Sequence, residues 1–524
     1  MAAIESDGPD RDEGGLRFDS PEGRWVLAVS VLGSGVAFLE ATVVNIALPE
    51  IGRDLGAGTG GLQWILNGYL LTLAALILLG GSLGDRFGRR LIFSIGVVWF
   101  TAASLLCAIA PNVELLVAAR VLQGVGGALL TPGSLAIIES TFRKEDRARA
   151  IGAWSGLGGA AAAIGPLLGG YLVEAVSWRA IFLINLPLGA FVVLMAYRHV
   201  PESRDPTAPG RLDYPGSILA ALGLAGVTYA LIQAGEENSS TAVVAATATI
   251  GIAALAAFVF AERRSPAPMM PLSIFASRQF TAANLVTFAV YAALGGVFFL
   301  LVAFLQVSMD YSPIAAGLAS LPVTVLMLLF SARAGALAQR IGARIPLTVG
   351  PLVIAAGMLM MTGIDPGDSY VGGVLPAVIV YGIGLTLVVA PVTATVLAAA
   401  DSRHSGVASG INNAVARVAG LLAVAILPLV AGITGDGFFD PAIMQDGFQT
   451  AMIFTAALAA AGGVIAFATI RPDVLDTETG PEGDSPTHAA TDRQCPVAGP
   501  GLRPSREADC ESAAPGERVA VLPR

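Results

Sequence analysis

The sequence contains little charge, few cysteines and few histidines. Only 13% of its 524 residues are charged, whereas soluble domains contain about 25%. Three cysteines are too few for a disulfide framework, and no CxxC pair or group of histidines suggests a bound metal. A net charge of −9 argues against a nucleic-acid-binding protein, which would carry a basic face. The scarcity of charge excludes an ordinary soluble protein.

Long apolar runs take up most of the chain. A bilayer core about 30 Å thick requires about 20 apolar residues per helix, and the sequence contains fourteen such runs. They are rich in glycine and alanine, as closely packed membrane helices are, and they lack the ten-residue alternation of a membrane β-barrel. The sequence therefore predicts an all-α polytopic membrane protein with 14 transmembrane helices at residues 25–48, 62–81, 91–110, 114–138, 150–173, 180–197, 214–234, 241–261, 281–304, 313–334, 345–364, 371–399, 404–432 and 449–470.

Basic residues are distributed unequally between the loops on the two sides. With the N-terminus in the cytoplasm, the cytoplasmic loops contain sixteen Lys and Arg residues and the outer loops contain two, Arg53 and Arg179. The outer loops instead contain acids, among them Glu236, Asp436 and Asp440. Because basic loops stay on the cytoplasmic side, we expect a multi-pass protein of the cell inner (cytoplasmic) membrane with both termini cytoplasmic.

Two strings with matching glycines and basic residues indicate an internal repeat. GSLGDRFGRR (Gly81 to Arg90) follows the second run, and GALAQRIGAR (Gly335 to Arg344) follows the tenth. The repeat predicts two six-helix halves that meet at a binding site. The predicted organisation is a cytoplasmic N-terminal tail (1–24), an N-terminal six-helix half (25–197), a linker with two extra transmembrane helices (198–279), a C-terminal six-helix half (280–470) and a disordered cytoplasmic tail (471–524).

These strings and several others resemble motifs of the major facilitator superfamily, in particular its fourteen-helix drug:proton antiporter branch. The resemblance covers about residues 25 to 470. It departs from the family pattern at Glu40, where the branch usually has Asp, and at Ala161, where a glycine is expected. The other matching strings are LEATVVNIALP (Leu39 to Pro49), ARVLQGVGGA (Ala119 to Ala128), GPLLGG (Gly165 to Gly170), WRAIFLINLPLG (Trp178 to Gly189) and SGINNAVARVAG (Ser409 to Gly420).

The resemblance implies the major facilitator fold (6 + 2 + 6 helices) and a function. That function is a proton-coupled antiporter that exports hydrophobic small molecules, such as drugs or antibiotics, across the cytoplasmic membrane by alternating access. The resemblance implies no enzymatic activity and no cofactor, with the proton motive force as energy source. The expected partners are the hydrophobic small-molecule substrate, protons and the lipid bilayer, with no nucleic acid, and the expected form is a monomer. Two alternatives are a dedicated exporter of a single endogenous metabolite, antibiotic or lipid, and a transport-inactive sensor or scaffold.

Glu40 is the one acid that lies deep inside a predicted span, and Arg120 and Arg417 are the deep bases. A charge at the bilayer centre costs ~2.5–3.5 kcal/mol on insertion scales, so each needs a partner or a function. At 1.5 Å per residue, Glu40 lies roughly 13 Å and Arg120 roughly 9 Å from the outer ends of their helices. The two side chains are therefore nearly level, and we expect them to meet.

A buried carboxylate beside a guanidinium can bind and release a proton. Low-dielectric surroundings and a neighbouring cation act in opposite senses on its proton affinity, so a small rearrangement could change its protonation. We predict that Glu40 carries the proton and that Arg120, in the family's helix-4 motif, adjusts its affinity. The alternative is a purely structural ion pair. Because the sequence shows no second deep carboxylate, we expect a low proton stoichiometry.

The loop after the second run is predicted to form a cytoplasmic gate. Asp85 could pair with Arg89 or Arg90, or face the positive N-terminus of a neighbouring helix, and the glycines would permit close backbone approach. The alternative is that these charges only fix the topology. The predicted gate residues are Gly81, Gly84, Asp85, Arg86, Gly88, Arg89 and Arg90.

The fifth run contains what resembles the family's antiporter motif. Its glycines would form a smooth face with a bend at the proline, which either serves ordinary small-residue packing or prevents proton leak. The motif residues are Gly152, Gly165, Pro166, Gly169 and Gly170.

Polar residues inside or at the ends of spans are candidates for the substrate cavity. The alternative for each is a hydrogen bond to a neighbouring helix. Arg417 could bind an anionic group of a substrate or satisfy helix-end carbonyls. The candidates are Asn45, Asn67, Tyr69, Gln123, Asn185, Asn284, Tyr291, Gln306, Tyr381, Asn412, Asn413 and Arg417.

Overall fold

A computed structural model describes residues 15–205, 212–236, 239–400 and 405–475. Within these residues the regular structure is helical, apart from an isolated bridge between Leu16 and Phe142. Thirteen described helices are long and apolar enough to cross a membrane, one fewer than expected. The remaining predicted span corresponds to α5, which has 32 residues. The sequence predicts a disordered tail over 471–524, but its first residues form the short helix η5 (Pro472–Leu475), so the prediction is wrong there. The rest of the tail, from residue 476 on, lies outside the described residues.

The helices follow the predicted runs and extend beyond most of them. The first group comprises α1 (Pro21–Leu55), α2 (Thr59–Phe87), α3 (Arg89–Ala108), α4 (Val113–Thr141), α5 (Lys144–Ala175), α6 (Ala180–Leu183) and α7 (Asn185–His199). The inserted hairpin comprises α8 (Tyr214–Ala234) and α9 (Thr241–Arg264). The second group comprises α10 (Arg278–Val307), α11 (Pro313–Ile341), α12 (Arg344–Met361), α13 (Leu375–Ala398), α14 (Ser405–Ala431) and α15 (Pro441–Thr469), with short helices η1 (Leu272–Ala276), η2 (Tyr370–Val374), η4 (Gly435–Phe439) and η5 (Pro472–Leu475).

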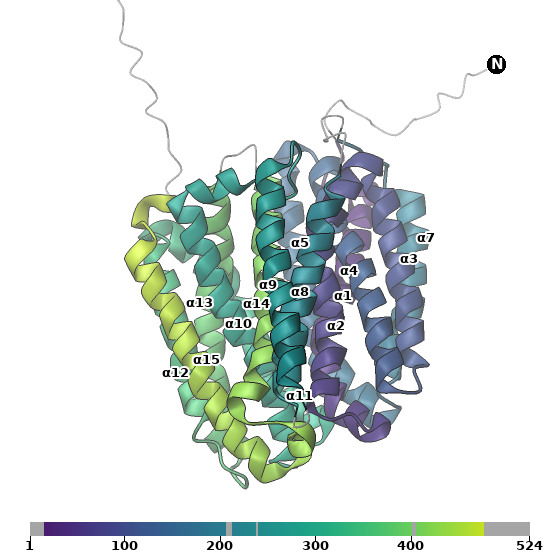
Figure 1. The fold of residues 1–524 in the computed structure, drawn as a ribbon. Coiled ribbons are helices and arrows are strands. Elements are labelled where there is room, and N and C mark those ends of the chain that lie inside the picture. The colour runs from purple at the N-terminus through teal and green to yellow at the C-terminus, as the bar shows by residue number, and fades with distance from the viewer. Residues whose placement is uncertain (1–14, 206–211, 237–238, 401–404, 476–524) are drawn as a thin grey trace, which may run out of the picture. The chain divides into compact units, whose positions relative to one another are not determined.

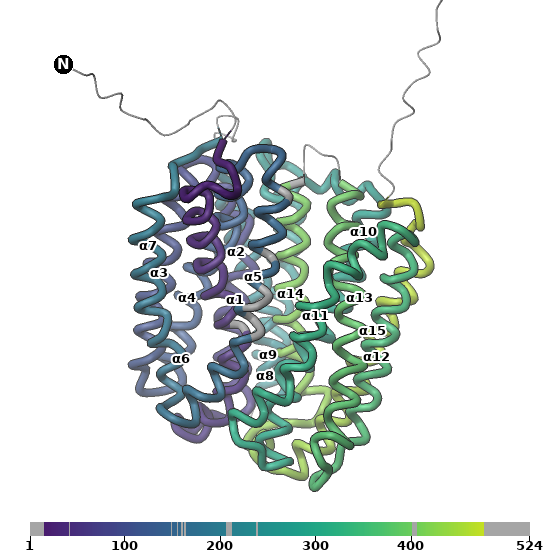
Figure 2. Tube along the Cα trace, turned by 180° about the vertical axis from the view of Figure 1, so that it is seen from behind, coloured from purple at the N-terminus to yellow at the C-terminus, as the bar shows by residue number. Residues whose placement is uncertain are grey.

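The two groups pack internally through equivalent helix pairs. In the first group α4 packs against α2 and α3, and α1 packs against α5. In the second group α13 packs against α11 and α12, and α10 packs against α14. The groups meet through α5 against α11 and α2 against α14. Figures 1 and 2 show the two groups side by side, seen from opposite sides. These two contacts are also equivalent, because α2 corresponds to α11 and α5 to α14 in chain order.

The inserted hairpin lies beside the contact between the two groups. α9 packs mainly against α8, and α8 packs against both α2 and α14 (Figure 1). Large apolar side chains on α9, such as Ile250 and Ile252, are more than half exposed, which suits contact with lipid. The hairpin therefore contacts one helix of each group.

Local sequence explains where two site-bearing helices begin and end. In α1, Ser20 accepts a hydrogen bond from Gly23 N, Pro21 occupies the first position, and Gly56 ends the helix at φ +66°. α1 is therefore longer than the predicted run. The chain breaks between α6 and α7, because Pro187 has no N–H to donate to the carbonyl of Leu183.

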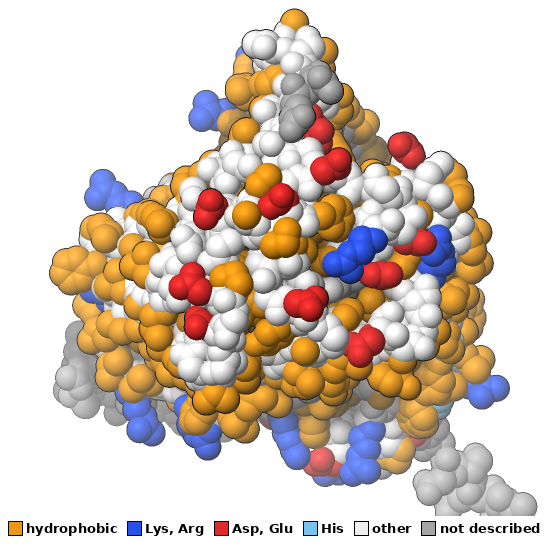
Figure 3. Space-filling view, turned by 90° about the horizontal axis from the view of Figure 1, so that it is seen from below, with side chains coloured by type: hydrophobic (Ala, Val, Ile, Leu, Met, Phe, Trp, Pro, Cys, Tyr) orange, Lys and Arg blue, Asp and Glu red, His pale blue; other side chains and the backbone are white. Residues whose placement is uncertain are grey.

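The two ends of the bundle differ in charge. α1 begins and α15 ends at the end that carries Arg86, Arg89 and Arg90, which we call the basic end. The opposite end carries the loops after α1, α8, α10 and α14, and we call it the acidic end. Figure 3 shows that Asp and Glu side chains are spread over this end.

Candidate functional site

Glu40 on α1 and Arg120 on α4 form a buried ion pair. Arg120 Nη1 lies 2.6 Å from Glu40 Oε1, and each side chain is 1% exposed. The structure thus brings together the two charges whose depths in the sequence are nearly level. Removing one partner of a buried pair leaves an uncompensated charge, at a cost of about 3–5 kcal/mol. Each charge therefore depends on the other for its place in the bundle.

Amides from two further positions complete a polar network around the pair. Asn185 Nδ2 donates to Glu40 Oε2 (2.9 Å) and to Ser104 Oγ (3.2 Å). Arg120 Nη1 donates to Gln123 Oε1 (2.5 Å), and Gln123 Nε2 donates to Ser104 Oγ (2.9 Å). Both carboxylate oxygens of Glu40 therefore have donors, as buried charges require. One network joins α1, α3, α4 and α7.

The guanidinium of Arg120 is enclosed on its other sides. Its Nε donates to the carbonyl of Ile65 on α2 (3.0 Å). Its Cζ lies 4.6 Å from the ring centroid of Tyr69 and 5.9 Å from that of Phe182, within the range of cation–π attraction. Arg120 is thus held more firmly than Glu40, so a change in the charge of Glu40 would act mainly on α1.

Three predicted cavity residues bond to neighbouring helices. Asn412 Nδ2 donates to Asn284 Oδ1 (3.2 Å) and Thr287 Oγ1 (2.8 Å), which joins α14 to α10. Gln306 Nε2 donates to the carbonyl of Ile46 (3.0 Å), which joins α10 to α1. These three residues therefore fit the alternative interpretation, a hydrogen bond to a neighbouring helix, better than a position in an open cavity.

Three other candidates are buried. Asn67 on α2 is fully buried, and neither its Oδ1 nor its Nδ2 has a hydrogen-bond partner. Tyr381 is buried where α13 packs against Gly357 of α12, away from the contact between the two groups. Asn45 is buried on α1. Of the three, Asn67 is the polar group that a ligand or a water would most readily satisfy.

Arg417 on α14 is half-buried and lies near the middle of its helix. Its Nε donates to Asn413 Oδ1 (3.3 Å), one turn earlier. The phenols of Tyr69 on α2 and Tyr291 on α10 are close enough to interact with its charge. In the part of the chain that the structure describes, no carboxylate lies within ion-pair distance of Arg417. Unlike Arg120, Arg417 is available to a polar or anionic group.

The predicted gate motif lies at the basic end. Arg89 Nε donates to Asp85 Oδ1 (2.9 Å), so Asp85 pairs with Arg89. Arg90 instead donates from Nη1 to the carbonyl of Val200 (3.0 Å). Arg86 is exposed, with its Cζ 5.2 Å from the adjoining Phe87 ring centroid. A half-exposed pair such as Asp85–Arg89 contributes about 0–1 kcal/mol, so it is a weak latch by itself.

Glu202, in the segment after α7, contacts the predicted gate motif, although the sequence did not single it out. Its Oε1 accepts from Arg90 N (3.0 Å) and its Oε2 from Leu91 N (3.1 Å). The carboxylate thus caps the N-terminus of α3, where negative charge is favourable. Gly88 has φ +125°, and a side chain there would stand 2.7 Å from the same carboxylate.

The close backbone approach expected of the gate glycines occurs elsewhere. A side chain on Gly81 or Gly84 would meet nothing closer than 3.6 Å. At the preceding position, a side chain on Gly80 would collide with the carbonyl of Ala128 on α4. That carbonyl lacks its usual helical donor because Pro132 has no N–H. The prediction for Gly81 and Gly84 is therefore wrong for this conformation, and Gly80 makes the contact.

Two of the antiporter-motif glycines of α5 pack against α1. Side chains on Gly165 and Gly169 would collide with Thr42 and Val43 of α1. Gly152, by contrast, faces open space. The smooth face is therefore a packing surface over the later part of α5 only.

The same face also contacts the second group. A side chain on Gly170 would stand 2.7 Å from the carbonyl of Pro313 at the start of α11, and one on Gly317 would collide with the carbonyl of Pro166. The backbones of α5 and α11 thus touch directly near the acidic end. Small residues are what permits such an approach.

Side-chain amides close the acidic end between the two groups. Gln63 Nε2 on α2 donates to the carbonyls of Val424 (2.7 Å) and Ala425 (3.0 Å) on α14. The carbonyl of Val424 lacks its usual donor because Pro428 has no N–H, so Gln63 satisfies it from the other group. Thr59 Oγ1 also donates to the carbonyl of Gly435 (2.8 Å). Among the described residues, the hydrogen bonds between the groups all lie nearer the acidic end.

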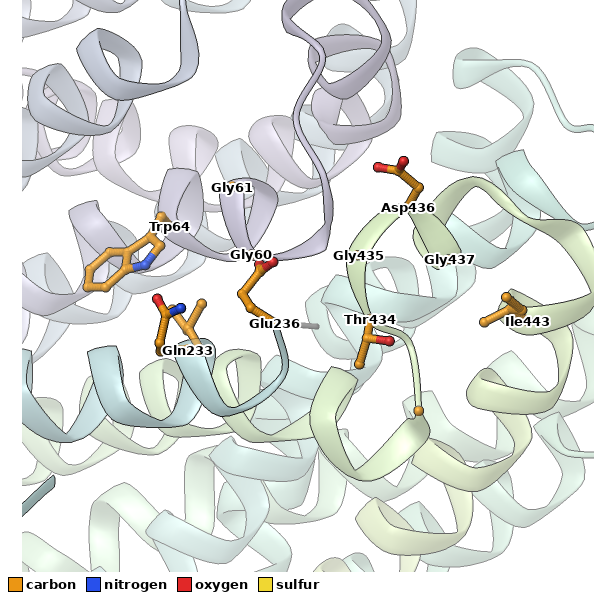
Figure 4. Close-up of a pocket in the computed structure, with 12 residues that line it drawn as sticks. Gly60, Gly61, Trp64, Gln233, Glu236, Thr434, Gly435, Asp436, Gly437 and Ile443 are labelled. Atoms are coloured by element: carbon orange, nitrogen blue, oxygen red, sulfur yellow. The ribbon is translucent and has the colours of Figure 1, made fainter. Parts of the chain in front are cut away.

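An open cavity of about 650 Å³ lies at the acidic end, between α2, α8 and the segment before α15 (Figure 4). The Glu236 carboxylate lies against Gly60, and that of Asp436 lies near Gly58, at the N-terminus of α2. No side chain of its own caps this N-terminus, and carboxylates near it are favourable. The cavity therefore belongs to the contact between the two groups and is separate from the polar network around Glu40 and Arg120.

The sequence carried a signal for some of the missed residues. Ser104 and Gln63 are polar residues inside or at the edge of apolar runs, which is the pattern used to select the other candidates. Glu202 lies in a loop among several charges, and no sequence pattern distinguishes it.

Known proteins resemble this chain in sequence and in fold. Residues 30–424 match the family model of the Major Facilitator Superfamily. The chain is 35% identical over 464 residues to the puromycin resistance protein pur8 of Streptomyces alboniger, covering 87% of this chain and 92% of that protein. It is 36% identical over 405 residues to the multidrug resistance protein Stp of Mycobacterium tuberculosis, covering 76% and 74%. The inward-facing crystal structure of a bacterial homolog of the human lysosomal transporter Spinster matches with a TM-score of 0.64 at 16% identity, over 86% of this chain and 97% of that one, which shows a shared fold.

Proposed function

This chain belongs to the Major Facilitator Superfamily, and from that membership we propose that it exports hydrophobic small molecules in exchange for protons. It is a multi-pass membrane protein. The basic end is assigned to the cytoplasm by the positive-inside rule, which places the acidic end outside. In this orientation the structure is closed toward the outside by the bonds of Gln63, Gln306 and Thr59.

The observation that carries the proposal is the buried Glu40–Arg120 pair. A purely structural role would be served as well by apolar side chains of similar volume, because burying an ion pair is costly. A titratable carboxylate with both oxygens satisfied by Arg120 and Asn185 is suited to bind a proton when those donors move. Glu40 is therefore assigned as the proton carrier, with Arg120 and Asn185 as the groups that hold its ionised form.

Protonation of Glu40 can be transmitted to the contact between the groups along α1. Six residues after Glu40, or about 9 Å along the helix, the carbonyl of Ile46 accepts the bond from Gln306 of α10. Neutralising Glu40 weakens its attraction to Arg120, which other partners hold in place. α1 is then free to shift, and a shift of α1 strains the Ile46–Gln306 bond at the acidic end.

The relatives indicate the kind of substrate. They are resistance proteins for puromycin in one case and for several drugs in the other, so we propose an antibiotic-like, hydrophobic small molecule. A dedicated substrate is the second candidate, and Arg417 favours one with an anionic or strongly polar group. Its guanidinium lies among the helices of both groups without an ion-pair partner in the described chain.

The proposal is tested with everted membrane vesicles that hold an acid interior, with a dye that reports the pH gradient. Lipophilic compounds of cationic, neutral and anionic type are added to vesicles containing wild type or Glu40→Gln. We expect some compounds to dissipate the gradient with wild type and none to do so with Glu40→Gln, which mimics the permanently protonated state. The charge of the active compounds identifies the substrate class.

The matched control is Glu50→Gln, which removes an exposed carboxylate from the same helix. It should retain exchange at the wild-type rate. Full exchange by Glu40→Gln would overturn the assignment of the proton carrier. If direct flux measurements with labelled antibiotics and cell metabolites also showed no transport by wild type, the transporter proposal itself would be wrong.

A further inference from the structure

Glu262, two residues before the last residue of α9 in the inserted hairpin, is a buried acid. It is 3% exposed, although its position at a helix end beside two arginines suggests a solvated side chain. Its Oε2 accepts a hydrogen bond from Met270 N (2.9 Å). Its Oε1 is buried and has no donor. Half of this carboxyl group is therefore without a partner inside the protein.

Asp213, at the N-terminus of α8, faces Glu262. Its Oδ1 caps α8 by accepting from Gly216 N (2.8 Å), and its Oδ2 is buried without a donor. Oε1 of Glu262 and Oδ2 of Asp213 lie 2.7 Å and 2.9 Å from the point where a Cβ on Gly216 would stand. The two carboxyl groups are within hydrogen-bonding reach of each other, and Gly216 leaves the space between them.

Two ionised carboxylates are unfavourable in this arrangement. Each would offer only acceptors, so the two facing oxygens would repel without a hydrogen bond. Like charges that share a buried site do not both ionise. A proton or a cation between the two oxygens would remove this repulsion.

The surroundings favour a proton over a cation. Arg263 and Arg264 adjoin Glu262 on α9, but both are exposed, and Arg264 lies over the ring of Phe260, 4.1 Å from its centroid. The Ser217 hydroxyl, on α8, is already donated to the carbonyl of Asp213 (2.9 Å). The described residues contain no group of three His, Cys, Asp or Glu side chains that could hold a metal ion. A proton needs only the two oxygens that are present.

We propose that Asp213 and Glu262 form a second proton-binding site, in which one proton is shared between Glu262 Oε1 and Asp213 Oδ2. The shared proton joins the two basic-end termini of the hairpin (Figure 1), and Met270 N ties the segment leading toward α10 to the same carboxyl. When the proton leaves to water, both groups are anionic and repel. The helix that Asp213 caps, α8, packs against α2 and α14, so the site lies on an element that contacts both groups and is separate from Glu40.

Infrared spectroscopy of the full-length protein in lipid tests the proposal directly. All variants carry Glu40→Gln, so that the other interior carboxyl does not contribute a signal. We expect the parent to show a carboxylic-acid C=O band at neutral pH that disappears as the pH is raised. Glu262→Gln and Asp213→Asn should each lack this band, while Glu236→Gln, which alters a half-buried acid at the opposite end of α8, should retain it.

The dependence of thermal stability on pH supplies an independent measurement. In the unfolded chain each carboxyl is solvated and ionised near neutral pH, so the folded protein binds one more proton than the unfolded protein. Its free energy of unfolding must then fall as the pH rises through dissociation of the shared proton. The unfolding constant of the parent should rise by up to about tenfold per pH unit relative to Glu262→Gln. The amide of that variant donates to Asp213 at every pH.

Two results would overturn the proposal. One is a parent protein without a carboxylic-acid band assignable to this pair. The other is a stability that depends on sodium, potassium, magnesium or calcium at constant ionic strength and loses that dependence in Glu262→Gln, which would show a cation site instead. Neither measurement involves transport, so the outcome is independent of the proposed antiport function.

Discussion

The acidic end is held closed by side-chain amides that cross between the two groups, and replacing them should open it. Gln63 makes two such bonds, to the carbonyls of Val424 and Ala425, and Gln306 makes one, to the carbonyl of Ile46. The double substitution Gln63→Leu/Gln306→Leu keeps similar bulk and removes all three bonds. It changes no charge and no residue of the Glu40 network.

The size of the effect follows from the number of bonds. Side-chain hydrogen bonds between membrane helices contribute about 0.6 kcal/mol each on average. Three of them amount to about 1.8 kcal/mol, and since about 1.4 kcal/mol corresponds to a factor of ten, the shift toward an open acidic end should be about 20-fold.

Spin labels on the acidic end can measure this shift. Leu115 at the start of α4 and Val371 in η2 are 53% and 69% exposed and belong to different groups. With the native cysteines replaced by serine, pulsed electron paramagnetic resonance should show a longer-distance population in the double variant. The matched control is Gln445→Leu, which removes an equivalent bond to the carbonyl of Ile364 (2.9 Å) inside the second group. An unchanged distance distribution in the double variant, or an equal change in the control, would refute the reasoning.

Two further substitutions test the packing at each end. Gly170→Ala places a methyl group 2.7 Å from the carbonyl of Pro313, so it should force α5 away from α11. The variant should lose about 1–3 kcal/mol of stability and show a longer distance between the same two spin labels. The control is Gly152→Ala, whose methyl group would face open space on the same helix and should change neither the stability nor the distance. Glu202→Ala removes the carboxylate that caps α3, and the loss of a cap costs about 1 kcal/mol, so amide exchange at Arg90 and Leu91 should become about fivefold faster. Unchanged exchange would show that another group caps this helix.

Helix positions and the depth of the buried charges follow from the sequence because both depend on distance along a helix. The apolar runs predict the helices of the bundle, and the fixed rise per residue places Glu40 and Arg120 at similar depth. The direction in which a side chain points requires the packing of neighbouring helices. Asn284 and Gln306, for example, lie within or at the end of a span as Asn185 does, yet only Asn185 reaches the buried ion pair, while the other two bond to groups outside it.

Long-range partners explain the contacts that the sequence could not predict. Gln63 and Val424 are 361 residues apart, and nothing in either local sequence indicates the other. Glu262 looks like a solvated acid because it adjoins Arg263 and Arg264, and only the approach of α8 buries it against Asp213. The prediction for the gate glycines contains a smaller error. The motif indicates that α2 closely approaches another backbone, but the glycine at that contact is Gly80 and not Gly81 or Gly84.

Two prolines each free a backbone carbonyl, but the two carbonyls make different kinds of contact, and the difference shows how the acidic end can open. In α4, Pro132 frees the carbonyl of Ala128, which lies against Gly80 of the same group and stays there when the groups move. In α14, Pro428 frees the carbonyl of Val424, which is satisfied by Gln63 from the other group. An unpaired carbonyl in hydrocarbon costs several kcal/mol, which would lock the closed state if lipid replaced Gln63.

Opening of the acidic end admits water to this contact instead of lipid, and water can bond to Val424 in place of the amide. The net cost of exchanging a protein bond for a water bond is about 0.5–1.5 kcal/mol. A proton moving down a gradient of one pH unit supplies about 1.4 kcal/mol, which is of the same size as the closing bonds taken together. Closure by a few weak amide bonds, each replaceable by water, is therefore strong enough to bias the resting state and weak enough to be reversed by the protonation of Glu40 that we propose.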